Sequence, residues 1–184
     1  GWDGSDPAPK AGPMGRWMSS RASTAERAKA IDFSDKYYKT PTSVSVAKGS
    51  GLKSTPESLK GKTIGVQVST TQEAYSQKHF PDSDLKSYQT SDESYQDIAA
   101  GRIDAVVADS LVVSDFLKTA AGACCEDAGY VEDDTAILGK GVGFGLRKGD
   151  PMKDTLNAAI AAIRADGTYD AITKKYFTFD IYGK

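Results

Sequence analysis

The sequence predicts an α/β fold with a parallel sheet, because short apolar runs alternate with helical patterns of about ten residues from Lys62 onward. Strands separated by helices in this way pair in parallel through right-handed crossovers. Two of the predicted strands, Thr63–Val68 and Ile103–Ala108, run directly into polar residues at their carboxyl ends. Small ligands bind at that end of the strands in open α/β sheets.

Length and composition agree with a globular protein. The 184 residues suffice for one ordinary domain or two small lobes, and 39% of them are hydrophobic. The net charge of -2 and the scattered basic residues do not indicate binding to nucleic acid or to an acidic membrane surface. The longest apolar runs, such as Ala105–Ala108, are too short to span a bilayer, and the chain shows no signal peptide pattern.

The first part of the chain is expected to be irregular. Residues 1 to 22 show no period of 2 or 3.6, and three prolines interrupt them. Ser23-Thr24-Ala25-Glu26 fits a capping box, which predicts a short helix from about Thr24 to Ala30. Alternating residues from Thr42 to Ala47 predict a strand.

The central part is more regular. Thr70-x-x-Glu73 fits a second capping box and predicts a helix that ends near His79. The other predicted elements here are the strand Leu85–Tyr88, a helix capped by Ser91 or Asp92 and ending at Gly101, the helix Leu111–Thr119, and the strands Tyr130–Val131 and Gly141–Leu146.

The last part is expected to be helical. Gly167 should end a first helix, Thr168 should cap a second, and Tyr169, Ile172 and Tyr176 should share a face of that second helix. The apolar face of the first helix has helical spacing and consists of Met152, Leu156, Ala159, Ile160 and Ile163.

Two groups of polar residues are candidates for holding a zwitterion. Residues 69–72 lie between a strand end and a helix start, where helix N–H groups favour a carboxylate or a phosphate. The absence of a GxxxxGK[ST] pattern favours a small carboxylate. Asp109 could hold an ammonium group, and Arg27 could bind a carboxylate with two hydrogen bonds. The alternatives are ordinary helix caps for residues 69–72 and Asp109, and a solvated surface arginine for Arg27.

Catalysis and metal binding have little support. His79 is the only histidine, and no Ser/His/Asp arrangement can be built around it. Cys124 and Cys125 are adjacent and lack a CxxC pattern or a nearby histidine, which argues against zinc. They could be two free thiols or an unusual vicinal pair, and we expect two loop cysteines without chemistry. A group of acidic residues lacks the D-x-[DN]-x-[DN]-G pattern of a calcium-binding loop, so we expect it to form a solvated loop. The group consists of Glu126, Asp127, Glu132, Asp133 and Asp134.

Several segments together resemble family 3 of the solute-binding proteins of ABC importers. The resemblance covers about residues 19 to 184 and is closest to the branch that binds lysine, arginine, ornithine or histidine and to opine-binding relatives. The segments that carry it are residues 23–38, 59–66, 69–75, 101–105, 141–148 and 166–169, and the ending Lys175-Tyr176-Phe177-Thr178-Phe179-Asp180-Ile181-Tyr182-Gly183.

The resemblance implies the fold of type II periplasmic binding proteins, in which two lobes close on an amino acid. Lobe 2 would span residues 44–146, with residues 1–43 and 147–184 in lobe 1. It also implies a periplasmic protein without cofactor or enzymatic activity, whose membrane partner is a permease. Among the site residues, Arg27 would clamp the ligand carboxylate with Thr71, Asp109 would hold the α-ammonium group, and Ser20 and Gln72 would line the pocket.

This chain also departs from the family pattern. The family has a further stretch before Trp2, which supplies an aromatic that stacks on the ligand and an acid that reads a basic side chain. We therefore expect a partial lobe 1, weak or lost binding, and dimerisation through exposed apolar surface. The alternatives are a lyase resembling cyclohexadienyl dehydratase, which would need an acid/base pair of which only Asp109 is a plausible member, and a non-binding interaction module.

Overall fold

The computed structural model describes residues 16–17, 22–177 and 180–183, which divide into two compact units. Unit 1 comprises Pro41–Leu138. Unit 2 comprises the described residues before Pro41 and those after Leu138. Within the described residues, no helix is both long and apolar enough to cross a membrane.

Unit 1 contains a mixed five-stranded sheet. Strand β4 is parallel to β5 and to β6, whereas β3 is antiparallel to β6 and β7. The prediction of a purely parallel sheet was therefore wrong at β3, because no crossover helix precedes that strand in unit 1 and alternation alone does not fix its direction. The strand order is β5 (Asp84–Tyr88), β4 (Thr63–Gln67), β6 (Ala105–Asp109), β3 (Thr42–Ala47) and β7 (Cys125–Tyr130).

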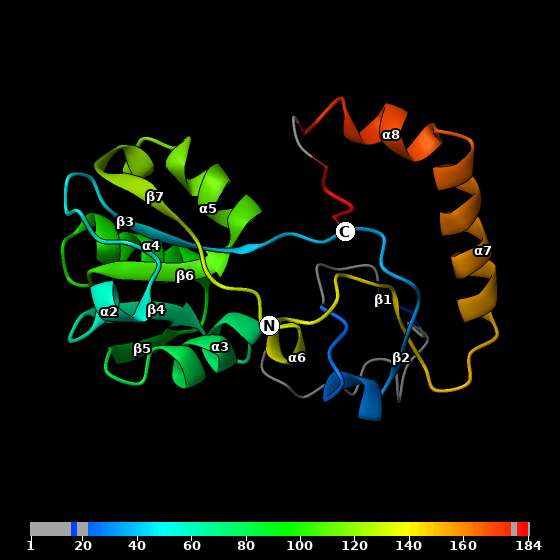
Figure 1. Ribbon diagram of the computed structural model, residues 1–184, viewed down its shortest axis with the longest axis horizontal. Helices are drawn as coiled ribbons and strands as arrows, with labels where there is room; N and C mark the ends of the chain where they lie inside the picture. Colours follow the sequence, from blue (N-terminus) through cyan, green and yellow to red (C-terminus); the bar gives the residue numbers. More distant parts are fainter. Residues whose placement is uncertain (1–15, 18–21, 178–179, 184) are drawn as a thin grey trace. The chain divides into compact units, whose positions relative to one another are not determined.

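Helices cover both faces of this sheet (Figure 1). Alternate strand residues point to opposite faces, so Ile64 and Val66 pack on one side while Val106 packs on the other. Residues of α2, α3 and α6 join the first face, and residues of α4 and α5 join the second. The bounds are α2 (Pro56–Leu59), α3 (Thr71–His79), α4 (Ser91–Ala99), α5 (Ser110–Leu117), η2 (Ala121–Cys124) and α6 (Thr135–Leu138).

Helix capping in unit 1 follows the sequence closely. The Thr70 hydroxyl accepts a bond from Glu73 N at 3.1 Å, as the capping box predicts, but the Glu73 carboxylate accepts from Ser69 N at 2.7 Å instead of from Thr70. Helix α4 begins one or two residues earlier than predicted, because its N-cap is Thr90 and not Ser91 or Asp92. Gly101, with φ +69°, follows that helix as predicted.

Unit 2 contains a small antiparallel sheet in the order β1-β8-β2. Its strands are β1 (Arg16–Trp17), β8 (Gly145–Leu146) and β2 (Asp32–Phe33). The expectation that residues 1 to 22 lack any regular element was thus wrong at β1. Strands of two residues are too short to show a period in the sequence.

The first predicted helix is only the 3-10 helix η1 (Arg27–Lys29). The Thr24 hydroxyl accepts a bond from Arg27 N at 3.2 Å, whereas the Ser23 hydroxyl donates to Gly141 O at 3.0 Å. The capping box predicted from Ser23 to Glu26 is therefore absent. The Ser23 hydroxyl instead forms a long-range hydrogen bond, which the local sequence cannot predict.

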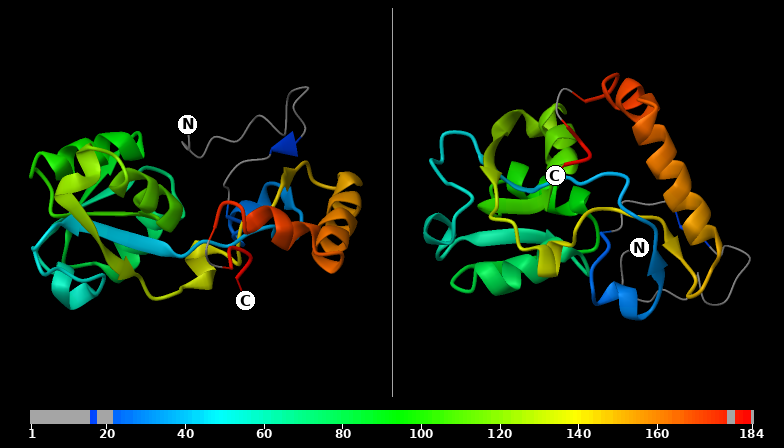
Figure 2. Two further views of the ribbon diagram at one scale, coloured as in Figure 1. Left: turned by 90° about the horizontal axis from the view of Figure 1, so that it is seen from above. Right: turned by 45° about the vertical axis from the view of Figure 1, so that its right-hand side comes forward.

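Two further helices follow in unit 2, α7 (Met152–Ala165) and α8 (Thr168–Thr173), drawn in orange to red in Figure 2. Of the predicted apolar face of α7, Ile160 is buried while Ala159 is exposed. Gly167, with φ +80°, is the N-cap of α8, so Thr168 is its first residue and not its cap. Ile172 and Tyr176 are 50% and 76% exposed.

Two glycines of unit 1 permit close packing, and their replacement by alanine should have different costs. A Cβ on Gly122 would lie 2.1 Å from the Phe116 carbonyl oxygen, a backbone atom, whereas a Cβ on Gly65 would lie 2.7 Å from the flexible Ile103 Cδ1. Overpacking typically costs about 1–3 kcal/mol. In urea unfolding, we expect Gly122→Ala to lower the free energy of unfolding by an amount near the upper end of this range. Gly65→Ala should lower it by an amount near the lower end. Equal costs would contradict the packing described.

Candidate functional site

The candidate site lies where β4 and β6 end side by side in unit 1. From β4 the chain passes to β5 on one side, and it later returns to form β6 on the other side. Such a reversal of strand order opens a crevice at the carboxyl ends of the strands, where ligands of α/β proteins bind. Thr70 and Thr71 follow β4, and Asp109 is the last residue of β6.

The β4 side of the site is a tight turn into α3. Ser69 has φ +61°, the left-handed conformation that side chains seldom adopt. The Glu73 carboxylate accepts from Ser69 N, and the Thr70 hydroxyl donates to Gln67 O at 2.7 Å. This turn places half-buried Thr71 and Gln72 in the first turn of α3. Backbone N–H groups of a first turn lack intrahelical acceptors and favour negative charge.

Three predicted site residues, Thr71, Gln72 and Asp109, lie around Thr42, which was not predicted. The Thr71 hydroxyl donates to Gln72 Oε1 at 3.2 Å, and Gln72 Nε2 donates to Thr42 Oγ1 at 3.2 Å. Thr42 is the first residue of β3 and lies directly opposite Asp109 in the antiparallel β3–β6 pair. The structure of unit 1 therefore brings Thr71, Gln72 and Asp109 together at the carboxyl ends of β4 and β6.

Asp109 also caps the helix that follows it. Its Oδ1 accepts a bond from Leu111 N at 2.9 Å, so the alternative interpretation of this residue as the N-cap of α5 is correct. The preceding residue, Ala108, belongs to the second apolar cluster, which includes Tyr95 and Phe116. Burial raises the pKa of Tyr95 above its usual range, and the negative charge of Asp109 adds to that effect. A half-buried carboxylate of this kind attracts a cation more strongly than a fully solvated one.

The fourth predicted site residue, Arg27, lies outside unit 1. Arg27 is half-buried at the start of η1 in unit 2, and its Nη1 donates to Ala22 O at 3.3 Å. Ser20 lies outside the described residues. The roles of both residues remain predictions.

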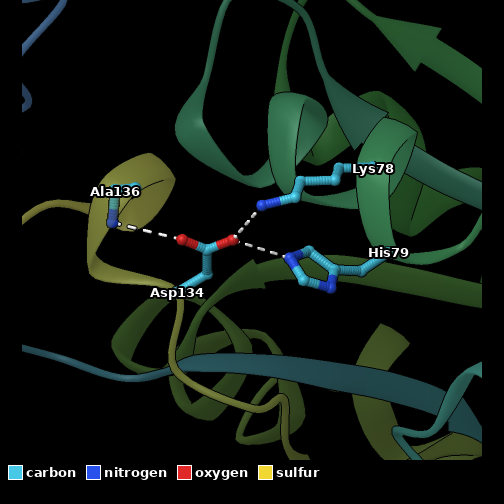
Figure 3. Close-up of polar contacts among 4 residues, drawn as sticks. All are labelled: Lys78, His79, Asp134 and Ala136. Atoms are coloured by element: carbon cyan, nitrogen blue, oxygen red, sulfur yellow. Dashed lines mark hydrogen bonds and ion pairs between the residues drawn. The ribbon is translucent and has the colours of Figure 1, made fainter.

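The single histidine belongs to a polar cluster at the other end of α3 (Figure 3). Asp134 Oδ2 lies 2.8 Å from both Lys78 Nζ and His79 Nε2, and Oδ1 accepts from Ala136 N at 3.1 Å. The His79 ring stacks on Tyr75 at a centroid distance of 4.2 Å. Asp134 lies in the loop before α6, as expected, but its side chain is only 15% exposed and is therefore not fully solvated. The cluster connects α3 to the segment that begins α6.

This cluster should make the stability of unit 1 depend on pH in the acidic range. Hydrogen bonds from Lys78 and His79 lower the pKa of Asp134 to about 2, so the contact stabilises the folded state above pH ~4 and is lost as the pH falls toward ~2. We expect the stability difference between the wild type and Asp134→Asn to shrink between pH 5 and pH 2 in urea unfolding. The matched control is Asp115→Asn, because its ion pair with Lys118 is exposed. A difference that stays constant with pH would contradict this assignment.

The two cysteines are not loop residues, which corrects the expectation from the sequence. Cys124 ends η2 and is exposed, whereas Cys125 begins β7 and is buried, and both are free thiols. Glu126 and Asp127 also lie in β7 and not in a solvated loop. In the part of the chain that the structure describes, no group of three or more His, Cys, Asp or Glu residues could hold a metal ion.

Comparison with known proteins identifies close relatives. The sequence pattern of the family described as bacterial extracellular solute-binding proteins, family 3, matches residues 1–179, farther toward the start of the chain than residue 19. The histidine-binding periplasmic protein of Escherichia coli (strain K12) is 42% identical over 96% of this chain and 70% of that protein. The lysine/arginine/ornithine-binding periplasmic protein of the same strain is 41% identical over the same shares.

A solved structure of an arginine-binding protein is similar to the structure of this chain. An ancestral arginine-binding protein bound to arginine has a TM-score of 0.83 and 32% identity over 96% of this chain and 77% of that one. The α/β fold predicted from the sequence is therefore confirmed. These three proteins are binding proteins by name, in agreement with the prediction of a protein that is not an enzyme.

Proposed function

This chain belongs to family 3 of the bacterial extracellular solute-binding proteins, and we propose that it binds a free amino acid with a basic or polar side chain. We place it as the solute-binding component of an ABC importer, with a membrane permease as its partner. We place it in the periplasm, because the names of two relatives state that location for those proteins.

The observation that carries the proposal is the arrangement of Thr71, Gln72 and Asp109 at the carboxyl ends of β4 and β6. The first turn of α3 offers N–H groups and the Thr71 hydroxyl to a carboxylate, while Asp109 offers negative charge to an ammonium group. An α-amino acid carries these two groups on one carbon atom. The arrangement therefore favours a free amino acid over a nucleotide or a sugar.

We assign the remaining contacts from the family resemblance. Arg27 would bind the α-carboxylate through its planar guanidinium group, which matches carboxylate geometry with two hydrogen bonds. Ser20 would add a contact from its backbone or hydroxyl. In this proposal lobe 2 spans residues 44–146, which include nearly all of unit 1 and residues 139–146 of unit 2, and the rest of unit 2 belongs to lobe 1.

Calorimetric titration of the purified chain with arginine, lysine, ornithine, histidine and glutamine tests this function. The sequence predicts weak binding, so we expect at least one of the five to bind with a Kd between about 10 μM and 1 mM, equivalent to about -7 to -4 kcal/mol. Glutamate serves as the control, because its acidic side chain should bind weakly or not at all. Millimolar or absent binding of all five amino acids would overturn the proposal.

We also propose that the chain forms a homodimer through the apolar side chains of α8 and the turn after it. Ile172 and Tyr176 are exposed large apolar residues of this region, and such exposed surface is typical of an association site. Light scattering at micromolar concentration should give twice the mass of one chain, and Tyr176→Glu should shift it toward the monomer. A wild-type monomer under these conditions would contradict the proposal.

A further inference from the structure

Cys124 and Cys125 bring two sulfur atoms unusually close at one end of the sheet in unit 1. Their Sγ atoms lie 2.9 Å apart, although both cysteines are free. The Cys124 side chain is exposed, while Cys125 is only 2% exposed. One thiol is thus accessible to a reagent in solution, and the second lies directly behind it.

The surrounding structure holds both thiols in this arrangement. Cys125 belongs to the second apolar cluster, and its backbone pairs with Ala47 of β3. The Cys124 carbonyl accepts from Lys48 N at 2.9 Å, and its thiol donates to Ala121 O at 3.2 Å. A disulfide bond is about 2.05 Å long, so the two sulfur atoms need to approach by less than about 1 Å to become bonded.

We propose that Cys124 and Cys125 form a site of reversible oxidation, at which a disulfide oxidant closes the two thiols into a vicinal disulfide. The proposal does not depend on the amino acid ligand. Ala47 and Thr42 lie at opposite ends of β3, and at ~3.4 Å per residue these ends are about 17 Å apart. The cysteines are therefore well separated from Asp109, which pairs with Thr42.

The reaction proceeds in two exchange steps. The Cys124 thiolate attacks one sulfur of glutathione disulfide, which releases one glutathione thiolate and leaves a mixed disulfide on Cys124. Cys125 then loses its proton, and its thiolate attacks Cys124 Sγ, which forms the new bond and releases the second glutathione thiolate. The protein loses two electrons and two protons, and glutathione disulfide is reduced to two thiols.

Two physical factors shape this reaction. Burial raises the pKa of Cys125 to about 12, so the second step is slower than the first and the mixed disulfide accumulates briefly. Neighbouring Cα atoms are ~3.8 Å apart, less than the ~4.4–6.8 Å usual for a disulfide, so the product is strained. Strained disulfides are reduced more readily than structural ones. The oxidised pair should therefore reopen under mild reduction.

The test is mass spectrometry of the native protein in buffers of varied glutathione to glutathione disulfide ratio. We expect a brief glutathione adduct, then a product lighter than the dithiol by two hydrogen atoms, with the bond within the peptide that contains both cysteines. Dithiothreitol should restore both thiols. The proposal is overturned if wild-type protein stays reduced at every ratio, stops at the glutathione adduct, or forms covalent dimers.

Two variants separate the roles of the thiols. Cys125→Ala should stop at a stable glutathione adduct on Cys124, because the resolving thiol is missing. Cys124→Ser changes an exposed residue and should leave one buried thiol that maleimide labels only after unfolding. Rapid labelling of the native Cys124→Ser protein would contradict the assignment of Cys125 as the shielded thiol. If Cys125→Ala does not fold, mass spectrometry of the wild-type peptide that contains both cysteines still tests the proposal.

Discussion

Replacement of Asp109 by Asn is expected to remove most of the amino acid binding while it leaves the fold intact. Asparagine caps a helix about as well as aspartate, so the bond from Leu111 N should persist. The negative charge proposed to hold the α-ammonium group is lost. Truncation of one member of a hydrogen-bonded charge pair costs about 2–5 kcal/mol, which corresponds to a weakening of about 30-fold or more. Calorimetric titration measures this change directly.

The matched control is Asp115→Asn, which removes the same charge from the helix that Asp109 caps. Asp115 is exposed and pairs with Lys118, so this variant should bind the ligand as the wild type does. Thermal unfolding of both variants checks that α5 is preserved. If Asp109→Asn binds within about threefold of the wild type, a shift below ~0.7 kcal/mol, Asp109 is a structural cap only.

Most elements of unit 1 could be predicted because local signals agree with the tertiary structure. Thr70 and Glu73 mark the start of α3, Gly101 follows the end of α4, and the strand Thr42–Ala47 has the predicted bounds. The direction of that strand could not be predicted. It depends on pairing with β6 and β7, which lie far along the chain, and no local pattern encodes the choice.

The same limit applies to the candidate site. Thr71 and Asp109 could be found because each follows an apolar strand, where polar residues are conspicuous in the sequence. Thr42 could not, because a threonine that begins a strand is ordinary and its position opposite Asp109 follows only from the antiparallel pairing. The turn at Ser69 could not be predicted either. Its φ is +61°, and a serine at that position does not indicate the left-handed conformation as a glycine or asparagine would.

Unit 2 was predicted less well because its elements are short and depend on distant contacts. The Ser23 hydroxyl bonds to Gly141 O, across a separation that no sequence window covers. Strands β1, β2 and β8 have two residues each and are defined by their pairing alone. Unit 1 has a comparable miss, since the acidic residues 126 and 127 belong to β7 although their composition is typical of a solvated loop.

Replacement of Arg27 by Gln is expected to weaken amino acid binding by an amount similar to Asp109→Asn, about 2–5 kcal/mol, because both remove a charged partner of the ligand. Arg27→Lys should be intermediate, since lysine keeps the charge but cannot form two parallel bonds. The Arg27 Nη1 bond to Ala22 O is lost in both variants, so thermal unfolding must accompany the titrations. Arg147→Gln, at an exposed position of unit 2, is the matched control.

Ligand analogues show which group Arg27 contacts. Agmatine is arginine without its α-carboxylate, so the wild type should bind agmatine much more weakly than arginine. This preference should largely disappear in Arg27→Gln, where the proposed carboxylate partner is gone, and it should persist in Asp109→Asn, where the ammonium partner is gone. An unchanged preference in Arg27→Gln would place Arg27 outside the carboxylate contact and leave Thr71 with the first turn of α3 as its main donors.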